Sequence, residues 1–267
     1  MSDISFEEFW KVTWEKDNEL EILKNKNSSY DKSVWTAWDK CYEAFSVEKD
    51  NDKLCLHLTA YLAHWGMYRG SSFFKNHNYK IHEKVVEILL NYRKSDLVGV
   101  QLNKLNDDKI KRISNIYGEV EKAYDVNTDD DVNKDENKNK PTDTLVTKIL
   151  LGTMACIPAY DSFFKRALSE FKKSDKEVEL GINLSVKSET REKAIKQLKD
   201  FCSYRNILEN ENMIKITRRL KRKGFKEMRI LDLYFFTYGR YLYSRDPQEA
   251  NKKEDKRDNR FDYIKDY

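Results

Sequence analysis

Apolar side chains recur every three or four residues in nearly every segment of the chain. In an α-helix this spacing places them on one side, so it predicts amphipathic helices packed around a shared interior. We expect helices over about residues 4–26, 30–45, 52–70, 80–94, 108–124, 143–153, 159–173, 189–203, 209–223 and 227–243. The segment 177–186 alternates apolar and polar residues and is a candidate for one short strand or an extended loop. The fold class that follows is mainly α, with at most one short strand pair.

One long polar segment interrupts this pattern. Residues 125–140, DVNTDDDVNKDENKNK, are almost entirely Asp, Asn and Lys, which is typical of a solvated loop or linker. We therefore expect an N-terminal helical lobe over 1–124, a C-terminal helical lobe over 141–245 and a charged tail over 246–267. A cleft between the two lobes would be the natural place for a site.

Composition limits the class of protein. The 267 residues are 39% hydrophobic and 13% aromatic, enough for one large core or two small ones. With 50 Lys and Arg against 46 Asp and Glu, the net charge of +4 does not by itself indicate a polyanionic partner. Neither an apolar run of membrane-spanning length nor a signal peptide is present, so we expect a cytoplasmic protein without a membrane partner. A monomer is a separate expectation, on which the sequence carries no direct signal. The four widely spaced cysteines predict reduced, buried thiols.

The segment 52–70 carries the first candidate binding face. His57, Tyr61, His64, Trp65, Tyr68 and Arg69 follow each other at helical spacing, and Leu56, Ala60, Ala63 and Met67 are expected to form the opposite, buried side. Aromatic faces next to an arginine suit stacking on a nucleobase, while a core helix with hydrogen-bonded polar tips explains the same pattern. The histidines lack acidic neighbours at ligand spacing, so we expect no metal and no cofactor.

A basic run forms the second candidate. KITRRLKRKGFKEMR, from Lys215 to Arg229, carries eight cations and one acid, interleaved with apolar residues that would hold it against the body of the protein. This density suits contact with several phosphates, through Arg218, Arg219 and Arg222 above all. A solvated helix face, balanced by the acidic loop, is the alternative.

Asp161 is the third candidate, in the stretch KILLGTMACIPAYDSFFKRAL. Pro158 cannot continue the preceding helix, so Asp161 falls near the start of the next one. There it can simply cap the helix. A helix start also keeps a carboxylate ionised and attracts phosphate, so Asp161 can instead stabilise a cation in a pocket, with Lys165 and Arg166 one turn further on.

The segment TLVTKILLGTMACIPAYDSFFKRAL resembles the part of helix-hairpin-helix DNA glycosylases that leads to the catalytic aspartate, in a pattern of the kind P-x-x-D-x-x-x-x-R. Pro158, Asp161 and Arg166 occupy these positions. The resemblance implies excision of a modified or damaged base from double-stranded DNA, in repair or in defence against foreign DNA such as that of phage. Asp161 would be catalytic, and His64, Trp65, Tyr68, Arg69 and Tyr160 would surround the base. Lys148, Lys165 and Arg166 would contact DNA.

Two other functions fit the same sequence. One is a noncatalytic helical module that binds nucleic acid or an acidic protein through the basic run, with Asp161 only a cap. The other is an enzyme that binds a small molecule or processes a nucleotide at the 57–69 face. The DNA glycosylase requires Asp161 to carry a charge that no neighbouring cation pairs, at the mouth of a cleft between the two lobes, whereas the binding module requires only a cap.

Overall fold

The structure, a computed structural model, describes residues 5–16, 34–68, 74, 77–124, 141–174, 190–211 and 213–245. The segments 125–140, 177–186 and 246–267 lie outside the described residues. The described chain is mainly helical and contains no strand, which confirms the fold class. Its helices are α1 (Phe6–Lys16), α2 (Val34–Val47), α3 (Asn51–His64), η3 (Tyr79–His82), α4 (Glu83–Tyr92), η4 (Leu102–Lys104), α5 (Asp107–Ala123), α6 (Asp143–Met154), α7 (Ser162–Ser174), α8 (Arg191–Tyr204), α9 (Ile214–Arg222) and α10 (Glu227–Ser244).

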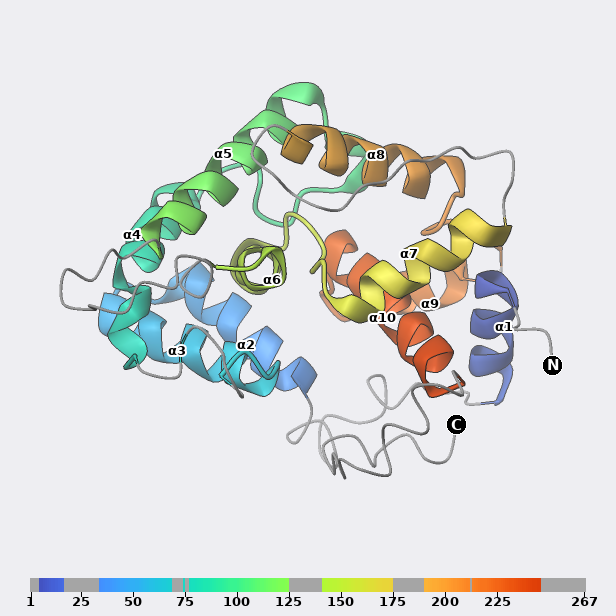
Figure 1. The fold of residues 1–267 in the computed structure, drawn as a ribbon, viewed down its shortest axis with the longest axis horizontal. Coiled ribbons are helices and arrows are strands. Elements are labelled where there is room, and N and C mark those ends of the chain that lie inside the picture. The colour runs from blue at the N-terminus through green and yellow to red at the C-terminus, as the bar shows by residue number, and fades with distance from the viewer. Residues whose placement is uncertain are drawn as a thin grey trace, which may run out of the picture.

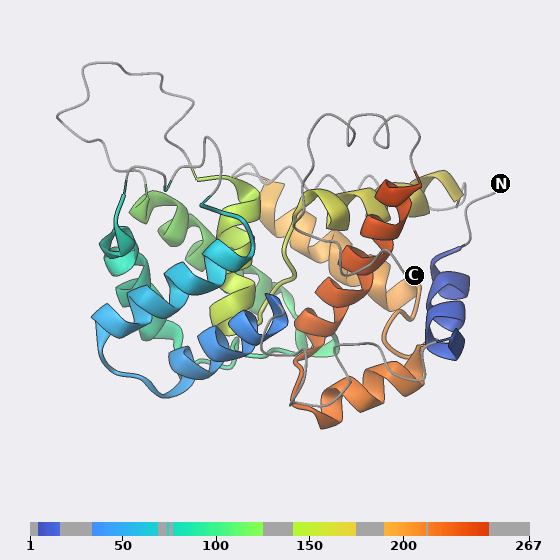
Figure 2. The same cartoon turned by 90° about the horizontal axis from the view of Figure 1, so that it is seen from below.

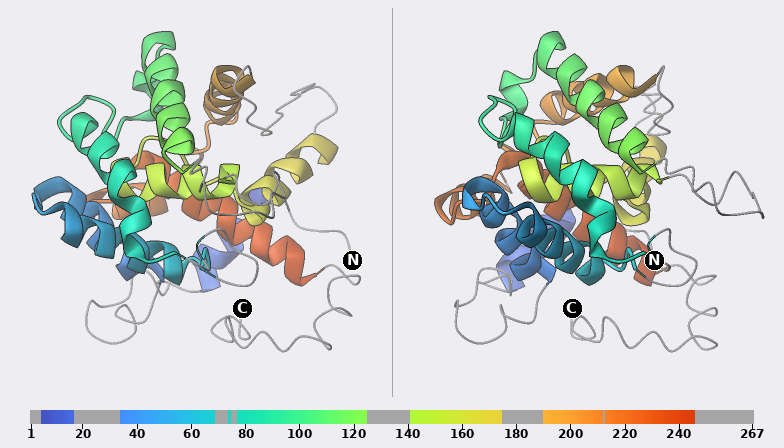
Figure 3. Two further views of the ribbon diagram at one scale, coloured as in Figure 1. Left: turned by 60° about the vertical axis from the view of Figure 1, so that its left-hand side comes forward. Right: turned by 90° about the vertical axis from the view of Figure 1, so that its left-hand side faces the viewer.

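Helix α6 is the centre of the fold. Figure 1 views it almost along its axis, with α2 and α3 on one side, α4 and α5 on another, and α7, α8 and α10 beyond. Every residue from Leu145 to Met154 is buried, as expected for a helix that is apolar on nearly all sides. Figure 3 shows α5 crossing over α6. Thr142 caps the start of α6, and Ala155 ends it in the left-handed conformation with φ 49°.

Helices α7 and α10 pack directly against each other. A side chain at Gly239 of α10 would place its Cβ 1.9 Å from the carbonyl oxygen of Phe163 in α7. Glycine is therefore required where the two backbones approach. The same pair brings Asp161, just before α7, next to the buried face of α10.

The two predicted lobes share one interior. The buried apolar residues form a connected cluster that runs from Phe6 of α1 to Leu242 of α10 and includes members of every α-helix. Trp38 of α2, in the N-terminal half, donates its indole N–H to the carbonyl of Leu151 in α6 at 3.0 Å. The four cysteines are buried and reduced, which confirms that prediction.

Helix α3 differs from the sequence interpretation at its end and in its buried face. It ends at His64, and Gly66 takes the left-handed position with φ 76°, so the predicted end near Gly70 is wrong. Bonds from Gly66 N–H to the Ala63 carbonyl and from Met67 N–H to the Leu62 carbonyl complete this Schellman cap. The buried side consists of Leu54, Cys55, Leu58, Tyr61 and Leu62. The side predicted to be buried faces outward, because Leu56, Ala60 and Ala63 are exposed.

Candidate nucleic-acid interface

Asp161 is buried and its charge is paired. Its Oδ1 accepts a hydrogen bond from the backbone N–H of Phe164 at 2.9 Å, which caps α7. Its Oδ2 lies 3.0 Å from the Lys148 ammonium, and the two side chains are 10% and 5% exposed. The expectation of an unpaired carboxylate at the mouth of a cleft is therefore wrong. An anion held by a buried lysine is not available to stabilise a sugar cation or to align a water.

A second buried ion pair lies beside the first. Arg229 donates to Asp232 at 2.9 Å, one turn along α10, and Asp232 also accepts the backbone N–H of Ala159 at 3.0 Å. Burial raises the pKa of Asp232 to about 6, while Arg229 and then Lys148 oppose the rise and Asp161 adds to it. The two acids and two bases thus form one neutral cluster that joins α6, α7 and α10. In the sequence, its only signal was an arginine and an aspartate three residues apart in the apolar run that forms α10.

Lys148 and Tyr160 belong to the interior. Lys148 is 4% exposed, and the Tyr61 hydroxyl donates to its backbone carbonyl at 3.0 Å. Tyr160 is 1% exposed and packs against Phe164 with ring centroids 5.8 Å apart. The prediction that Lys148 contacts DNA is wrong, because the body of the protein covers it. Tyr160 cannot receive a base for the same reason.

Trp65 is half-buried over the charge cluster. The Lys148 ammonium lies 4.2 Å from the centre of its ring, and the Arg229 guanidinium lies 5.4 Å away. The ring also meets Phe236 edge to face at 5.4 Å. The structure thus brings Trp65, Lys148 and Asp161 together, as a tertiary contact. In this arrangement Trp65 shields buried cations, so its described contacts do not support the role of a base-stacking platform.

Neither His64 nor Tyr68 of the 57–69 face contacts Asp161. His64 is exposed, and its Nδ1 lies 2.8 Å from the Ala60 carbonyl of its own helix. Tyr68 stacks on Phe74 at 4.8 Å and bonds through its hydroxyl to His82 Nε2 at 2.7 Å. Arg69 lies outside the described residues. The aromatic stripe is thus divided between the surface and a separate internal cluster.

His82 is a buried residue that the sequence analysis did not single out. Its Nδ1 lies 2.6 Å from the Tyr124 hydroxyl, and its side chain is fully buried. Burial lowers its pKa to about 3, so the ring is neutral and bonds to one tyrosine on each side. This cluster ties the end of α3 to η3 and to the end of α5. No sequence pattern marks it, because its members are far apart in the chain.

Lys165 and Arg166 lie half-buried on α7. The Arg166 guanidinium lies 5.7 Å from the ring of Tyr243 in α10. Their contact with DNA stays a prediction.

Helix α9 carries the basic run on its outer side. Ile216, Thr217 and Leu220 are buried, whereas Lys215, Arg218 and Arg222 are exposed. Within the described residues none of these three cations forms an ion pair. Lys221, also exposed, lies 2.5 Å from Glu227. Figure 2 shows α9 along one edge of the molecule, where its outer side faces away from the other helices.

The structure corrects the extent of the basic run. Arg229 does not belong to the surface, because it is fully buried in the charge cluster. Arg219 is only half-buried and has contacts of its own. We call Lys215, Arg218 and Arg222 the α9 basic face. They lie three and four residues apart, so they share one side of the helix.

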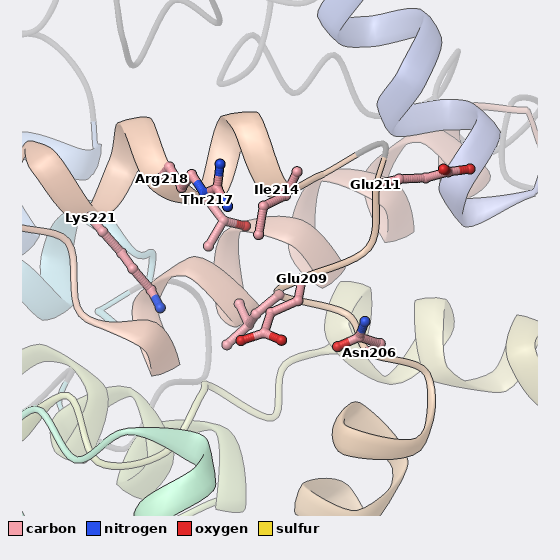
Figure 4. Close-up of a pocket in the computed structure, with 8 residues that line it drawn as sticks. Asn206, Glu209, Glu211, Ile214, Thr217, Arg218 and Lys221 are labelled. Atoms are coloured by element: carbon pink, nitrogen blue, oxygen red, sulfur yellow. The ribbon is translucent and has the colours of Figure 1, made fainter.

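A hollow of about 630 Å³ adjoins this face. It is lined by residues of α9 and of the chain that leads from α8 into it: Asn206, Leu208, Glu209, Glu211, Ile214, Thr217, Arg218 and Lys221. In Figure 4, Glu209 lies between Lys221 and Asn206, whereas the Glu211 carboxylate points away from these residues. The hollow and the α9 basic face share Arg218.

Comparisons with known proteins give no indication of a function for this chain. No family model, no curated protein and no solved structure matches the chain. Among the described residues, no group of three or more His, Cys, Asp or Glu side chains could hold a metal ion. Within the same part of the chain, no helix has the length and apolar character needed to cross a membrane.

Proposed function

We propose that this protein is a noncatalytic helical module that binds nucleic acid through the α9 basic face. The single observation that carries the proposal is the division of α9 into a buried apolar side and an exposed side bearing Lys215, Arg218 and Arg222. A helix whose cations are fixed in one row by its own packing presents them to a polyanion without ordering a flexible segment. Two of the three are arginines, whose planar forks suit phosphate oxygens.

Local charge supports a phosphate-bearing partner better than the whole chain does. The net charge of +4 is spread over 267 residues, but the α9 basic face concentrates three cations on two turns of one helix. The rise of an α-helix is about 1.5 Å per residue, so the row spans about 10 Å. Such a row contacts successive backbone phosphates in a sequence-independent way.

Base excision at Asp161 is not part of the proposal. The mechanism implied by the glycosylase resemblance needs an ionised carboxylate beside a flipped nucleotide. Asp161 uses one oxygen to cap α7 and the other to neutralise Lys148. Its two oxygens therefore already have structural partners, and the binding module is the function that the geometry supports best.

The test is the salt dependence of binding before and after charge reversal. We expect the Arg218→Glu/Arg222→Glu variant to bind fluorescent oligonucleotides more weakly. Two lost phosphate contacts should make the slope of log K against log salt shallower by about 1.8 on duplex DNA or about 1.4 on single strands. Fluorescence anisotropy over a salt series gives the slope directly.

A matched control distinguishes the effect of the α9 basic face on binding from the effect of the net charge of the protein. Lys84→Glu/Lys111→Glu reverses two exposed lysines on α4 and α5 and takes the net charge from +4 to zero, as the α9 variant does. We expect this control to keep most of the wild-type slope. If both variants lose the same affinity, binding follows total charge and the α9 basic face is not the site.

A further inference from the structure

We infer that the hollow beside α9 receives an unpaired base, so that the strand bound by the α9 basic face is single-stranded. This inference rests on the proposed function and names the form of its ligand. The hollow and the α9 basic face share Arg218, so a strand whose phosphates contact Arg218 has its bases within reach of the hollow.

The lining of the hollow suits a base better than a phosphate. The Glu209 carboxylate lies between Lys221 and Asn206 in a hollow of about 630 Å³ and would repel a phosphate placed beside it, while Lys221 is already paired with Glu227. A nucleobase instead offers amino groups that a carboxylate accepts and a flat apolar surface that Leu208 and Ile214 contact. Asn206 adds an amide that both donates and accepts.

An exposed aromatic residue precedes the lining residues of the hollow in the chain. Tyr204, the last residue of α8, is 68% exposed, one of the few large apolar side chains that the described surface leaves open. It precedes Asn206 by two residues, so their Cα atoms are at most about 7.6 Å apart. Aromatic rings beside a cationic groove are the platforms on which proteins stack the bases of single strands.

Duplex DNA does not fit this arrangement. In a duplex the Watson–Crick edges are paired and the base faces are stacked, so neither Glu209 nor Tyr204 would find its partner. In an unpaired strand both surfaces of the base are open. The cations on α9 then contact the phosphates outside the hollow, and the carboxylate inside the hollow contacts one base.

The position of Glu209 predicts a preference among bases. It lies between Lys221 and Asn206 (Figure 4). A carboxylate accepts from the amino group of cytosine, whereas thymine and uracil place a carbonyl oxygen at that position. We therefore expect oligo-dC to bind about tenfold more tightly than oligo-dT of the same length and charge.

Two matched pairs of variants test the residues. Glu209→Gln offers amide donors to thymine and should level the two affinities, whereas Glu211→Gln, whose carboxylate points away from Glu209, should keep the preference. Tyr204→Ala should weaken both oligonucleotides about tenfold through lost stacking, whereas Tyr204→Phe, which keeps the ring, should bind as the wild type does. Circular dichroism of each variant checks that the helices are intact.

The experiment is fluorescence anisotropy of the full chain with oligo-dC, oligo-dT, a hairpin duplex and the RNA pair oligo-rC and oligo-rU. The inference is supported if oligo-dC binds more tightly than oligo-dT, if single strands bind more tightly than the duplex, and if only Glu209→Gln loses the preference for oligo-dC. The RNA pair shows which sugar is preferred. Equal affinity for the two oligonucleotides, or tighter binding of the duplex, overturns the inference. The proposed function still stands in that case if Arg218→Glu/Arg222→Glu weakens binding. If that variant changes nothing, both fail.

Discussion

The buried pair of Lys148 and Asp161 allows a sharp prediction about stability. Asp161→Asn keeps an oxygen to accept the Phe164 N–H, so the cap of α7 is largely retained. The charge is lost, however, and the amide nitrogen then faces an ammonium that is 5% exposed. Breaking a buried pair by removing one partner costs about 3–5 kcal/mol, because the other charge remains in the interior.

The neighbours of Lys148 place the expected loss at the lower end of that range. Its ammonium lies 4.2 Å from the centre of the Trp65 ring, which attracts a cation. The carboxylate of Asp232 also interacts with Lys148. We therefore expect Asp161→Asn to lower the free energy of unfolding by about 3 kcal/mol. For a domain of this size that corresponds to a fall in Tm of about 6–12 °C.

Urea unfolding followed by circular dichroism measures the loss. Asp200→Asn, an exposed carboxylate on α8, is the matched control and should change stability by less than about 0.5 kcal/mol. The double variant Lys148→Met/Asp161→Asn removes both charges and keeps the volume of the lysine stem. It should recover most of the loss, since no ion remains buried without its partner.

The outcome also decides between the two roles of Asp161. An Asp161→Asn protein as stable as the wild type would refute the reasoning above. If that variant also lost an ability to create abasic sites in duplexes with modified bases, the catalytic interpretation would replace the structural one. Alkali cleavage of a panel of such duplexes detects abasic sites directly.

Two further predictions concern packing and pH. Gly239→Ala should cost about 3 kcal/mol in urea unfolding, because its Cβ would meet the Phe163 carbonyl at 1.9 Å; Thr237→Ala on the same helix should cost much less. His82 has a folded pKa of about 3, below its unfolded value of 6.5, so its contribution to stability is complete above pH 6.5 and is lost as the pH falls. The stability difference between the wild type and His82→Gln should shrink by about 1.4 kcal/mol per pH unit between pH 6 and 4. A constant difference would show that His82 does not titrate in this way.

The helical fold and its main boundaries were predictable from local pattern. Periodic apolar residues marked each described α-helix, and Pro158 marked the connector after α6. The basic face of α9 was also visible, because alternating cations and apolar residues on a short helix leave one arrangement that buries the apolar ones. The end of α3 was missed because two glycines, Gly66 and Gly70, suit the same cap, and only the backbone decides which one takes it.

The partners of charged residues were not predictable in the same way. Lys148 and Asp161 are 13 residues apart, and Arg229 and Asp232 reach them from another helix. Periodicity tells which side of a helix is apolar, but a polar residue within that side gives no indication of its partner. The interpretation of Asp161 as a free charge was therefore wrong, although its capping role was confirmed.

The sequence by itself determined that this chain forms amphipathic helices with reduced cysteines inside and a concentrated row of cations on one helix. These properties depend on side chains that are neighbours in sequence, so the spacing of residues along the chain is enough to predict them. Only the tertiary structure decided that α6 is central, that Arg229 is internal while Arg218 is exposed, and that the aspartate before α7 is neutralised. Such properties depend on which helices meet, and the energy of a buried charge depends on whether a counter-charge from another helix arrives beside it.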